Sequence, residues 1–165
     1  MLRKIIQPAL LPLALTLATC GDGDNPVNTG HDDEAHADAF GVQIISSGQE
    51  LARYENGEVS GEIEVGHGRV TPLLTVRFID EDGDMFTPHA DDNFSLSWEI
   101  ADGEIAEVEQ HAAEGAWSFH INGVENGQTS IVIKLNHAGH SDFVSKEIPI
   151  HVEEDGPGEE HEHEG

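Results

Sequence analysis

The sequence WSFHINGVENGQTSIVIKL, residues 117–135, decides the fold class of this chain. Large apolar residues occupy every second position on both sides of a stretch bounded by Gly123 and Gly127. A period of two places apolar side chains on one face of a β-strand and the intervening polar residues on the other. The glycines and the asparagine between the two runs are typical of a turn. We therefore expect two antiparallel strands, residues 117–122 and 129–136, joined by a short connection.

Alternation of the same kind runs through residues 40–152. We expect further strands at residues 40–45, 50–54, 59–65, 73–79, 94–100, 105–110 and 143–152. Within 94–100, Trp98 shares its parity with the other large apolar residues and should point into the core. Residues 105–108 also permit a helical turn, but no long run has the helical period of 3.6 residues. Short strands with turn signals at regular spacing predict an all-β sandwich.

Two motifs resemble the bacterial immunoglobulin-like domain of the group 2 type. The first is Ile105-Ala106-Glu107-Val108, and the second is the turn at residues 123–129, which has the form G-x-x-x-G-x-T. The resemblance covers residues 70–152 and implies an immunoglobulin-like β-sandwich, although a fold does not by itself imply a function. Residues 46–70 form a longer segment than the family pattern implies.

The first twenty residues, MLRKIIQPALLPLALTLATC, resemble a bacterial lipoprotein signal peptide. Arg3 and Lys4 form a basic start, residues 5–18 are mostly apolar, and Cys20 is the only cysteine of the sequence. The apolar run is too short and too interrupted by proline to predict a transmembrane helix. We expect residues 1–19 to be removed and Cys20 to carry a lipid anchor in the cell envelope; the alternative is an ordinary secretory signal with a chance cysteine. Gly21 favours the outer membrane if the host has one.

The segments on either side of the alternating region have a different composition. Residues 20–39 and 153–165 contain few large apolar residues and many charges. This composition predicts a disordered tether before the domain and a disordered, His/Glu-rich tail after it. The folded domain is therefore expected at residues 40–152.

The net charge of the chain excludes one large class of partner. Asp and Glu number 33 against 7 Lys and Arg, which gives a formal charge of −26. This charge argues against nucleic acid as a partner, because phosphate binding needs clustered basic residues. Enzyme chemistry is not indicated either, since no glycine-rich phosphate loop, nucleophile elbow or HExxH motif occurs.

Two histidines stand in the connection LNHAGHSDF, residues 135–143, where a tight turn needs only glycine, asparagine or aspartate. Alternate connections of an antiparallel sandwich emerge at the same end, so residues 80–93, 110–116 and 135–143 should lie together. Their side chains would form a metal site. The predicted ligands are His89, His111, His137, His140 and Asp142, with Asp84, Asp91 and Asp92 as further acids. Imidazole and carboxylate suit zinc, and copper and nickel also bind imidazole. The alternative is that these are solvated loop residues.

Weaker signals lie elsewhere in the sequence. The tail residues His31, His36, His161 and His163 favour metal binding by composition, with little geometric selectivity. The stretch DEDGD, residues 80–84, has some similarity to a calcium loop but lacks the EF-hand glutamate. Its Asp-Gly pair favours a hairpin turn instead. His67, His120 and His151 are expected in a turn or on outward strand faces, outside the predicted site.

Two functions follow from these patterns. The first is a lipid-anchored extracytoplasmic protein with an immunoglobulin-like domain that binds a divalent transition metal, zinc first, for capture, buffering or hand-over. The alternative is an adhesion or interaction module of the cell envelope that binds an envelope protein and has no metal role. An enzyme is the lowest-ranked interpretation.

Overall fold

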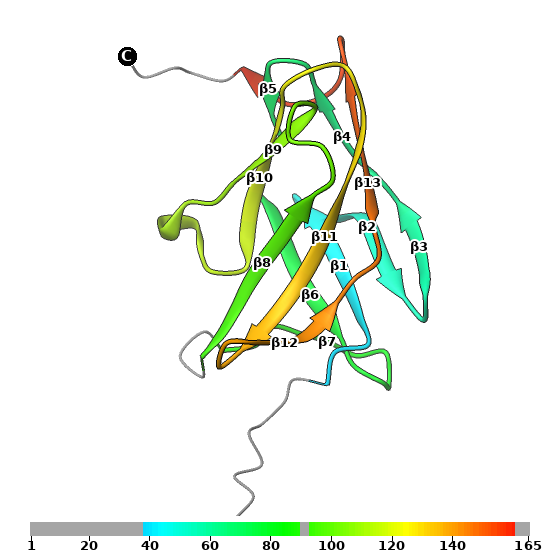
Figure 1. Ribbon diagram of the computed structural model, residues 1–165, viewed down its shortest axis with the longest axis vertical. Helices are drawn as coiled ribbons and strands as arrows, with labels where there is room; N and C mark the ends of the chain where they lie inside the picture. The colour runs from blue at the N-terminus through cyan, green and yellow to red at the C-terminus, as the bar shows by residue number, and fades with distance from the viewer. Residues whose placement is uncertain (1–37, 90–92, 161–165) are drawn as a thin grey trace, which may run out of the picture. The chain divides into compact units, whose positions relative to one another are not determined.

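The alternating runs form β-strands that are arranged in two sheets (Figure 1). The computed structural model describes residues 38–89 and 93–160. The strands are β1 (Gly41–Ser46), β2 (Gln49–Glu55), β3 (Glu58–Gly61), β4 (Ile63–Gly66), β5 (Arg69–Val70), β6 (Leu74–Ile79), β7 (Met85–Phe86), β8 (Phe94–Ile100), β9 (Ala106–Glu109), β10 (Ser118–Gly123), β11 (Gly127–His137), β12 (His140–Val144), β13 (Ile148–Glu153) and β14 (Glu159–Glu160). A short 3-10 helix, η2 (Ala112–Glu114), lies between β9 and β10. No helix in these ranges is long and apolar enough to cross a membrane.

The first sheet is built around β6 and is widened by a meander of three strands. β6 pairs with β10 on one side and with β1 on the other, and β2 and β3 follow beyond β1. The β2–β3 turn contains Asn56 and Gly57 with φ of 52° and 83°, as a two-residue hairpin turn requires. The meander, together with β4 and β5, accounts for the length of residues 46–70, which exceeds the immunoglobulin-like pattern.

The second sheet is built around β11. β8 pairs along one edge of β11, β13 and β12 pair along the other, and β4 runs parallel to β13. The strand expected at residues 143–152 is in fact two strands. The chain bends at Ser145, whose Oγ accepts a hydrogen bond from the amide of Ile133 (2.9 Å) and donates to the carbonyl of Lys146 (2.7 Å). A register shift between Leu135 and Asn136 also interrupts the pairing of β12.

The core lies between the two sheets. Its largest fully buried side chains are Phe78, Phe119, Ile44, Ile63, Leu74, Ile79, Ile121, Ile131, Ile133, Leu135, Ile148 and Ile150. The expected orientation of Trp98 is confirmed, because its ring packs against Phe119 of the opposite sheet with centroids 5.8 Å apart. Trp98 stays partly exposed because β8 is the outermost strand of its sheet. The described residues thus form an all-β sandwich of two packed sheets.

One expected strand is confirmed, and two expected boundaries differ in the structure. The single strand expected at residues 59–65 is two strands, β3 and β4, which belong to different sheets. Residues 106–109 are a strand and not a helical turn, because they pair with β10 from Ala106↔Gly123 to Glu109↔His120. The tail expected to begin at residue 153 is wrong for residues 153–160. Gly156 packs against β4 so closely that a Cβ would lie 2.6 Å from the Val65 carbonyl oxygen, and β14 then pairs with β5. The absence of a side chain at position 156 lets this polar segment join the fold.

Candidate functional site

The two histidines of LNHAGHSDF flank the turn of a β-hairpin. His137 is the last residue of β11, and His140 is the first residue of β12. His137 and His140 are register partners, and the turn between them is Ala138-Gly139, with φ of 48° and 90°. The His137 side chain is 11% exposed and stacks on Phe94 of β8, with ring centroids 4.2 Å apart and planes 20° from parallel. Its Nδ1 lies 3.8 Å from Asp142 Oδ2. His137 is therefore a packing residue, whereas His140 is exposed.

A second pair of histidines consists of His111, which lies between β9 and η2, and His120 of β10. His120 Nδ1 is 2.8 Å from the Thr71 carbonyl oxygen, and His120 Nε2 is 3.0 Å from Glu114 Oε2. The His111 ring lies 5.9 Å from that of His120, and His111 Nε2 is 3.3 Å from Glu109 Oε1. A carbonyl oxygen only accepts, so Nδ1 of His120 carries hydrogen and Nε2 faces a carboxylate. This geometry places a carboxylate oxygen beside Nε2, where a metal cation could also bind.

The sequence predicts that His120 lies on an outward face of its strand. The structure shows instead that other segments of the chain cover this side chain. The side chain is only 15% exposed, because Thr71 and the η2 turn lie over it. Alternation within one strand carries no signal for a neighbour that comes from another connection, so no pattern in residues 117–122 could have shown this.

The structure does not gather the predicted metal ligands into one preformed group. His137 contacts Phe94 and Asp142, whereas His111 contacts Glu109 and His120. Within residues 38–89 and 93–160, no group of three or more His, Cys, Asp or Glu side chains is positioned to hold a metal ion. His89 is exposed. The remaining candidates, Asp91, Asp92, His31, His36, His161, His163 and the lipidation site Cys20, lie outside the described residues, and the zinc site stays a prediction.

The stretch DEDGD forms the hairpin turn that its sequence favoured over a calcium loop. Asp80 Oδ1 accepts hydrogen bonds from the amides of Asp82 (3.0 Å) and Asp84 (2.9 Å). Gly83 has a φ of 85°, and β6 pairs with β7 across the turn. Oδ1 of Asp80 therefore stabilises the turn.

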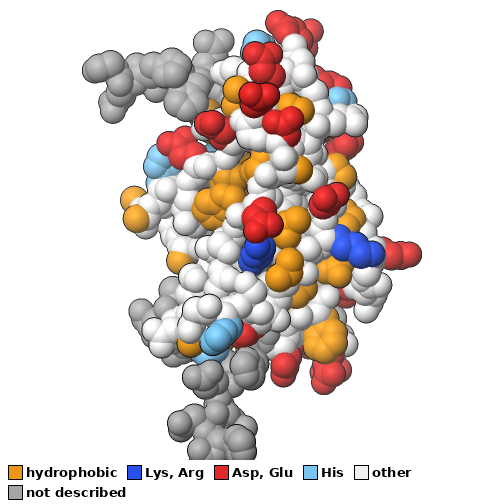
Figure 2. Space-filling model, in the orientation of Figure 1, with side chains coloured by type: hydrophobic (Ala, Val, Ile, Leu, Met, Phe, Trp, Pro, Cys, Tyr) orange, Lys and Arg blue, Asp and Glu red, His pale blue; other side chains and the backbone are white. Residues whose placement is uncertain are grey.

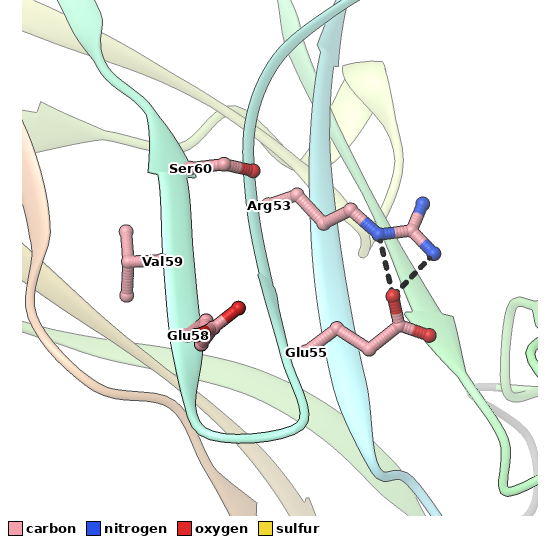
Figure 3. Close-up of a pocket in the computed structure, with 5 residues that line it drawn as sticks. All are labelled: Arg53, Glu55, Glu58, Val59 and Ser60. Atoms are coloured by element: carbon pink, nitrogen blue, oxygen red, sulfur yellow. Dashed lines mark hydrogen bonds and ion pairs between the residues drawn. The ribbon is translucent and has the colours of Figure 1, made fainter.

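A polar hollow lies along the edge strand β3 and is lined by Arg53, Glu55, Glu58, Val59 and Ser60 (Figure 3). Figure 3 shows the Arg53 guanidinium turned towards Glu55, with Val59 pointing the opposite way. Arg53 Nη2 is 2.8 Å from Glu55 Oε2 and its Nη1 is 3.5 Å from Glu50 Oε2. Since its cation is already paired with two carboxylates of the chain, this hollow is a weak candidate for binding an anion.

On the opposite side of the domain, where β8 and β9 end the two sheets, three apolar side chains are partly exposed. We call this the β8–β9 side and define it by the partly exposed side chains of Trp98, Ile100 and Val108. Both strands lie towards the left of the view in Figure 1, and Figure 2 shows apolar atoms there, beside the upper part of β8. Acidic side chains surround this area, namely Glu99, Glu104 and Glu107, all of which are exposed.

Comparisons with known proteins find similarity only in solved structures. No family model matches the sequence, and no curated protein matches it. A structure of domains 4 and 5 of the S-layer protein SbsC is similar, with 22% identity, a TM-score of 0.41, and coverage of 57% of this chain and 48% of that one. A structure of domains 5–6 of the same protein has 24% identity and a TM-score of 0.42, covering 59% of this chain and 42% of that one. The chain thus spans less than half the length of either structure, and the similarity concerns part of the fold.

Proposed function

We propose that this chain is an interaction module of the cell envelope, anchored by lipid on Cys20, which binds a protein partner through the β8–β9 side. The anchor is supported by the basic start, the apolar run and the cysteine at the end of the N-terminal segment. The binding surface is supported by the geometry of the sandwich. The S-layer domains contribute a similarity of fold and nothing further.

The observation that carries this proposal is a tryptophan-containing apolar strip on an otherwise acidic protein. Trp98 and Ile100 of β8 and Val108 of β9 are partly exposed, and their neighbours are glutamates. Protein interfaces are typically apolar and aromatic at the centre with a polar rim, and a few such anchors carry most of the binding energy. The β3 side has an ion-paired, polar hollow instead.

Site-specific cross-linking in intact cells tests the proposal. A photoreactive amino acid is placed at Glu107, which is exposed on β9, and in a second protein at Glu58, which is exposed on β3. We expect one discrete protein adduct from position 107 and none from position 58. Diffuse or equal labelling from both positions, or none from position 107, would contradict an interface on the β8–β9 side.

Zinc capture is the second candidate; the contact between His120 and Glu114 favours it, and it requires His111 to turn towards them, since no three such side chains of the described residues are already positioned to hold a metal ion. Hydrogen bonding of His120 Nδ1 to a backbone carbonyl fixes the tautomer that leaves Nε2 available to a metal, as in many zinc sites. His111 is half exposed, so its ring can turn towards His120. Two imidazoles and one carboxylate would then match a zinc ligand set.

Calorimetric zinc titration tests this second candidate on the full chain with His31, His36, His161 and His163 replaced by Asn. We expect one site, which His120→Gln and His111→Gln each remove and which His140→Gln leaves intact. Loss of the site in His140→Gln but not in His120→Gln would favour the ligands predicted from sequence. No binding to the parent protein would exclude both sets.

A further inference from the structure

The outer edge of β8 is the longest strand edge that the described part of the chain leaves unpaired. β8 has seven residues and pairs with β11 along one edge. No strand within residues 38–89 and 93–160 pairs with its other edge. Among the other edge strands, β12 has five residues, and β3, β4 and β9 each have four. An unpaired edge presents backbone donors and acceptors to which another strand can bind.

Hydrogen bonds at both ends of the β8–β11 ladder show which residues point their backbone outward. The amide of Ala101 donates to the Ser130 carbonyl (3.0 Å), and the amide of Ala138 donates to the Asn93 carbonyl (3.3 Å). Hydrogen-bonded and non-hydrogen-bonded pairs alternate along an antiparallel ladder. By this alternation the positions 95, 97 and 99 bond to β11. The outward-facing backbone groups belong to Phe94, Leu96, Trp98 and Ile100.

These four residues also turn their side chains towards the core, which sets the pattern of an added strand. A residue that forms a hydrogen-bonded pair with Trp98 places its own side chain on the same face of the sheet. There it would cover the partly exposed Trp98, Ile100 and Val108. Its sequence neighbours would lie on the outer face beside Ser97 and Glu99. The partner strand therefore needs apolar residues at every second position.

The acidic residues around β8 determine which side chains the partner strand should carry at the positions between its apolar residues. Glu99 is 68% exposed on the outer face of β8, Glu107 is exposed on β9, and Glu104 is exposed just before β9. The nearby base Lys134 is already paired with Glu99, with Nζ and Oε1 2.5 Å apart. A second copy of the chain would bring another formal charge of −26 to this edge, so a positively charged strand is favoured over self-association.

We infer that β8 binds an extended segment of a protein partner as an added antiparallel strand, in which apolar residues alternate with lysine or arginine. The inference rests on the proposed function and names the partner chemistry of the same surface. Backbone hydrogen bonds supply the attraction in such strand addition, and the alternate side chains supply the specificity.

The probe is a capped heptapeptide of alternating lysine and valine, added to the full chain. Amide hydrogen exchange is measured by NMR, residue by residue. We expect the Leu96 and Trp98 amides, which face outward, to exchange fast in the free protein and to slow about tenfold or more at saturating peptide. The Ser97 amide, which bonds to β11, should be protected with or without peptide. Binding should weaken as the salt concentration rises.

Two matched peptides test the strand geometry without changing the protein. In the docked strand the valine amides face β8 and the lysine amides face away, so N-methylation at three valines should abolish binding. N-methylation at three lysines should preserve it. In the protein, Ile100→Lys should weaken binding about tenfold or more, whereas Val144→Lys, at an exposed position on β12, should not.

Three results would overturn the inference: no protection of Leu96 and Trp98 by the peptide, equal binding of the two methylated peptides, or protection that rises with protein concentration alone. The last would identify a second copy as the occupant. Cross-links from position 107 combined with no peptide binding would reject strand addition and retain the interaction module. If the peptide binds but no cross-link forms in cells, the proposed interaction module is rejected as the cellular function, whereas strand addition at β8 is retained.

Discussion

His137 illustrates how a neighbour distant in sequence decides the role of a residue. Its sequence context, three positions before a second histidine, favoured a metal ligand. In the structure its ring is stacked on Phe94 and only 11% exposed, while His140 is exposed. The turn was predictable from Asn136 and Gly139, but the stacking was not, because it depends on the register between β8 and β11.

Replacing the two histidines separately distinguishes packing from exposure. His137→Ala removes an aromatic stack worth about 0.5–1.5 kcal/mol beyond its buried area, so we expect a loss of about 1–2 kcal/mol in the free energy of unfolding. His140→Ala should change it by less than about 0.5 kcal/mol, as is usual for surface positions. Urea denaturation measures both, and equal losses would mean that the stack contributes nothing.

Gly156 tests the boundary of the folded domain. A Cβ there would lie 2.6 Å from the Val65 carbonyl oxygen and 2.8 Å from the Gly66 nitrogen, which are backbone atoms of β4. Gly156→Ala should therefore destabilise the protein by about 1–3 kcal/mol, the usual cost of overpacking. Gly103→Ala is the matched control, because no heavy atom lies within 4 Å of a Cβ at that position. If thermal unfolding shows the two variants to be equally stable, residues 153–160 do not pack on the domain.

At the scale of the elements, strands were predictable wherever one face is buried and the other exposed. β8 was expected at residues 94–100 and is found there, since its apolar parity is uninterrupted. The single strand expected at 143–152 failed because the bend at Ser145 depends on hydrogen bonds to Ile133, which no local pattern encodes. β14 was missed for a similar reason: its residues are polar, and the pairing with β5 is long-range.

The register of β8 can be tested by neighbouring substitutions. Trp98 packs against Phe119 but is partly exposed, so Trp98→Ala should cost about 3 kcal/mol, the lower end of the range for large aromatic residues. Ser97 lies on the opposite face, and its Oγ accepts a hydrogen bond from Asn136 Nδ2 (2.8 Å). Ser97→Ala should therefore cost about 1 kcal/mol. A greater loss for Ser97→Ala in chemical denaturation would place the wrong face of β8 in the core.

At the scale of the whole molecule, topology determines which strands and side chains are accessible, and charge determines which partners can approach them. The predicted convergence of three connections at one end rested on strand order alone, whereas the side chains divide into separate contacts at His137 and at His120. Strand order determines which connections share an end, but the lengths of β9 and β10 and the η2 turn determine where each side chain lies. The same topology leaves β8 and β9 as the last strands of their sheets, and the acidic residues beside them restrict which partner can approach.

The remaining prediction concerns attachment of the chain to a membrane. If Cys20 carries the lipid, Cys20→Ala should move the protein from the membrane fraction to the soluble fraction of the host, because the anchor depends on that thiol. One acyl chain binds a bilayer only marginally, so the modified cysteine should carry more than one, which mass spectrometry of the detergent-extracted protein measures. Thr19→Ala is the control and should leave the protein in the membrane fraction, since alanine is common before the lipidated cysteine of lipoproteins. Cys20→Ala protein that still sediments with membranes after a high-salt wash would contradict the anchor, because salt removes attachment that is only electrostatic.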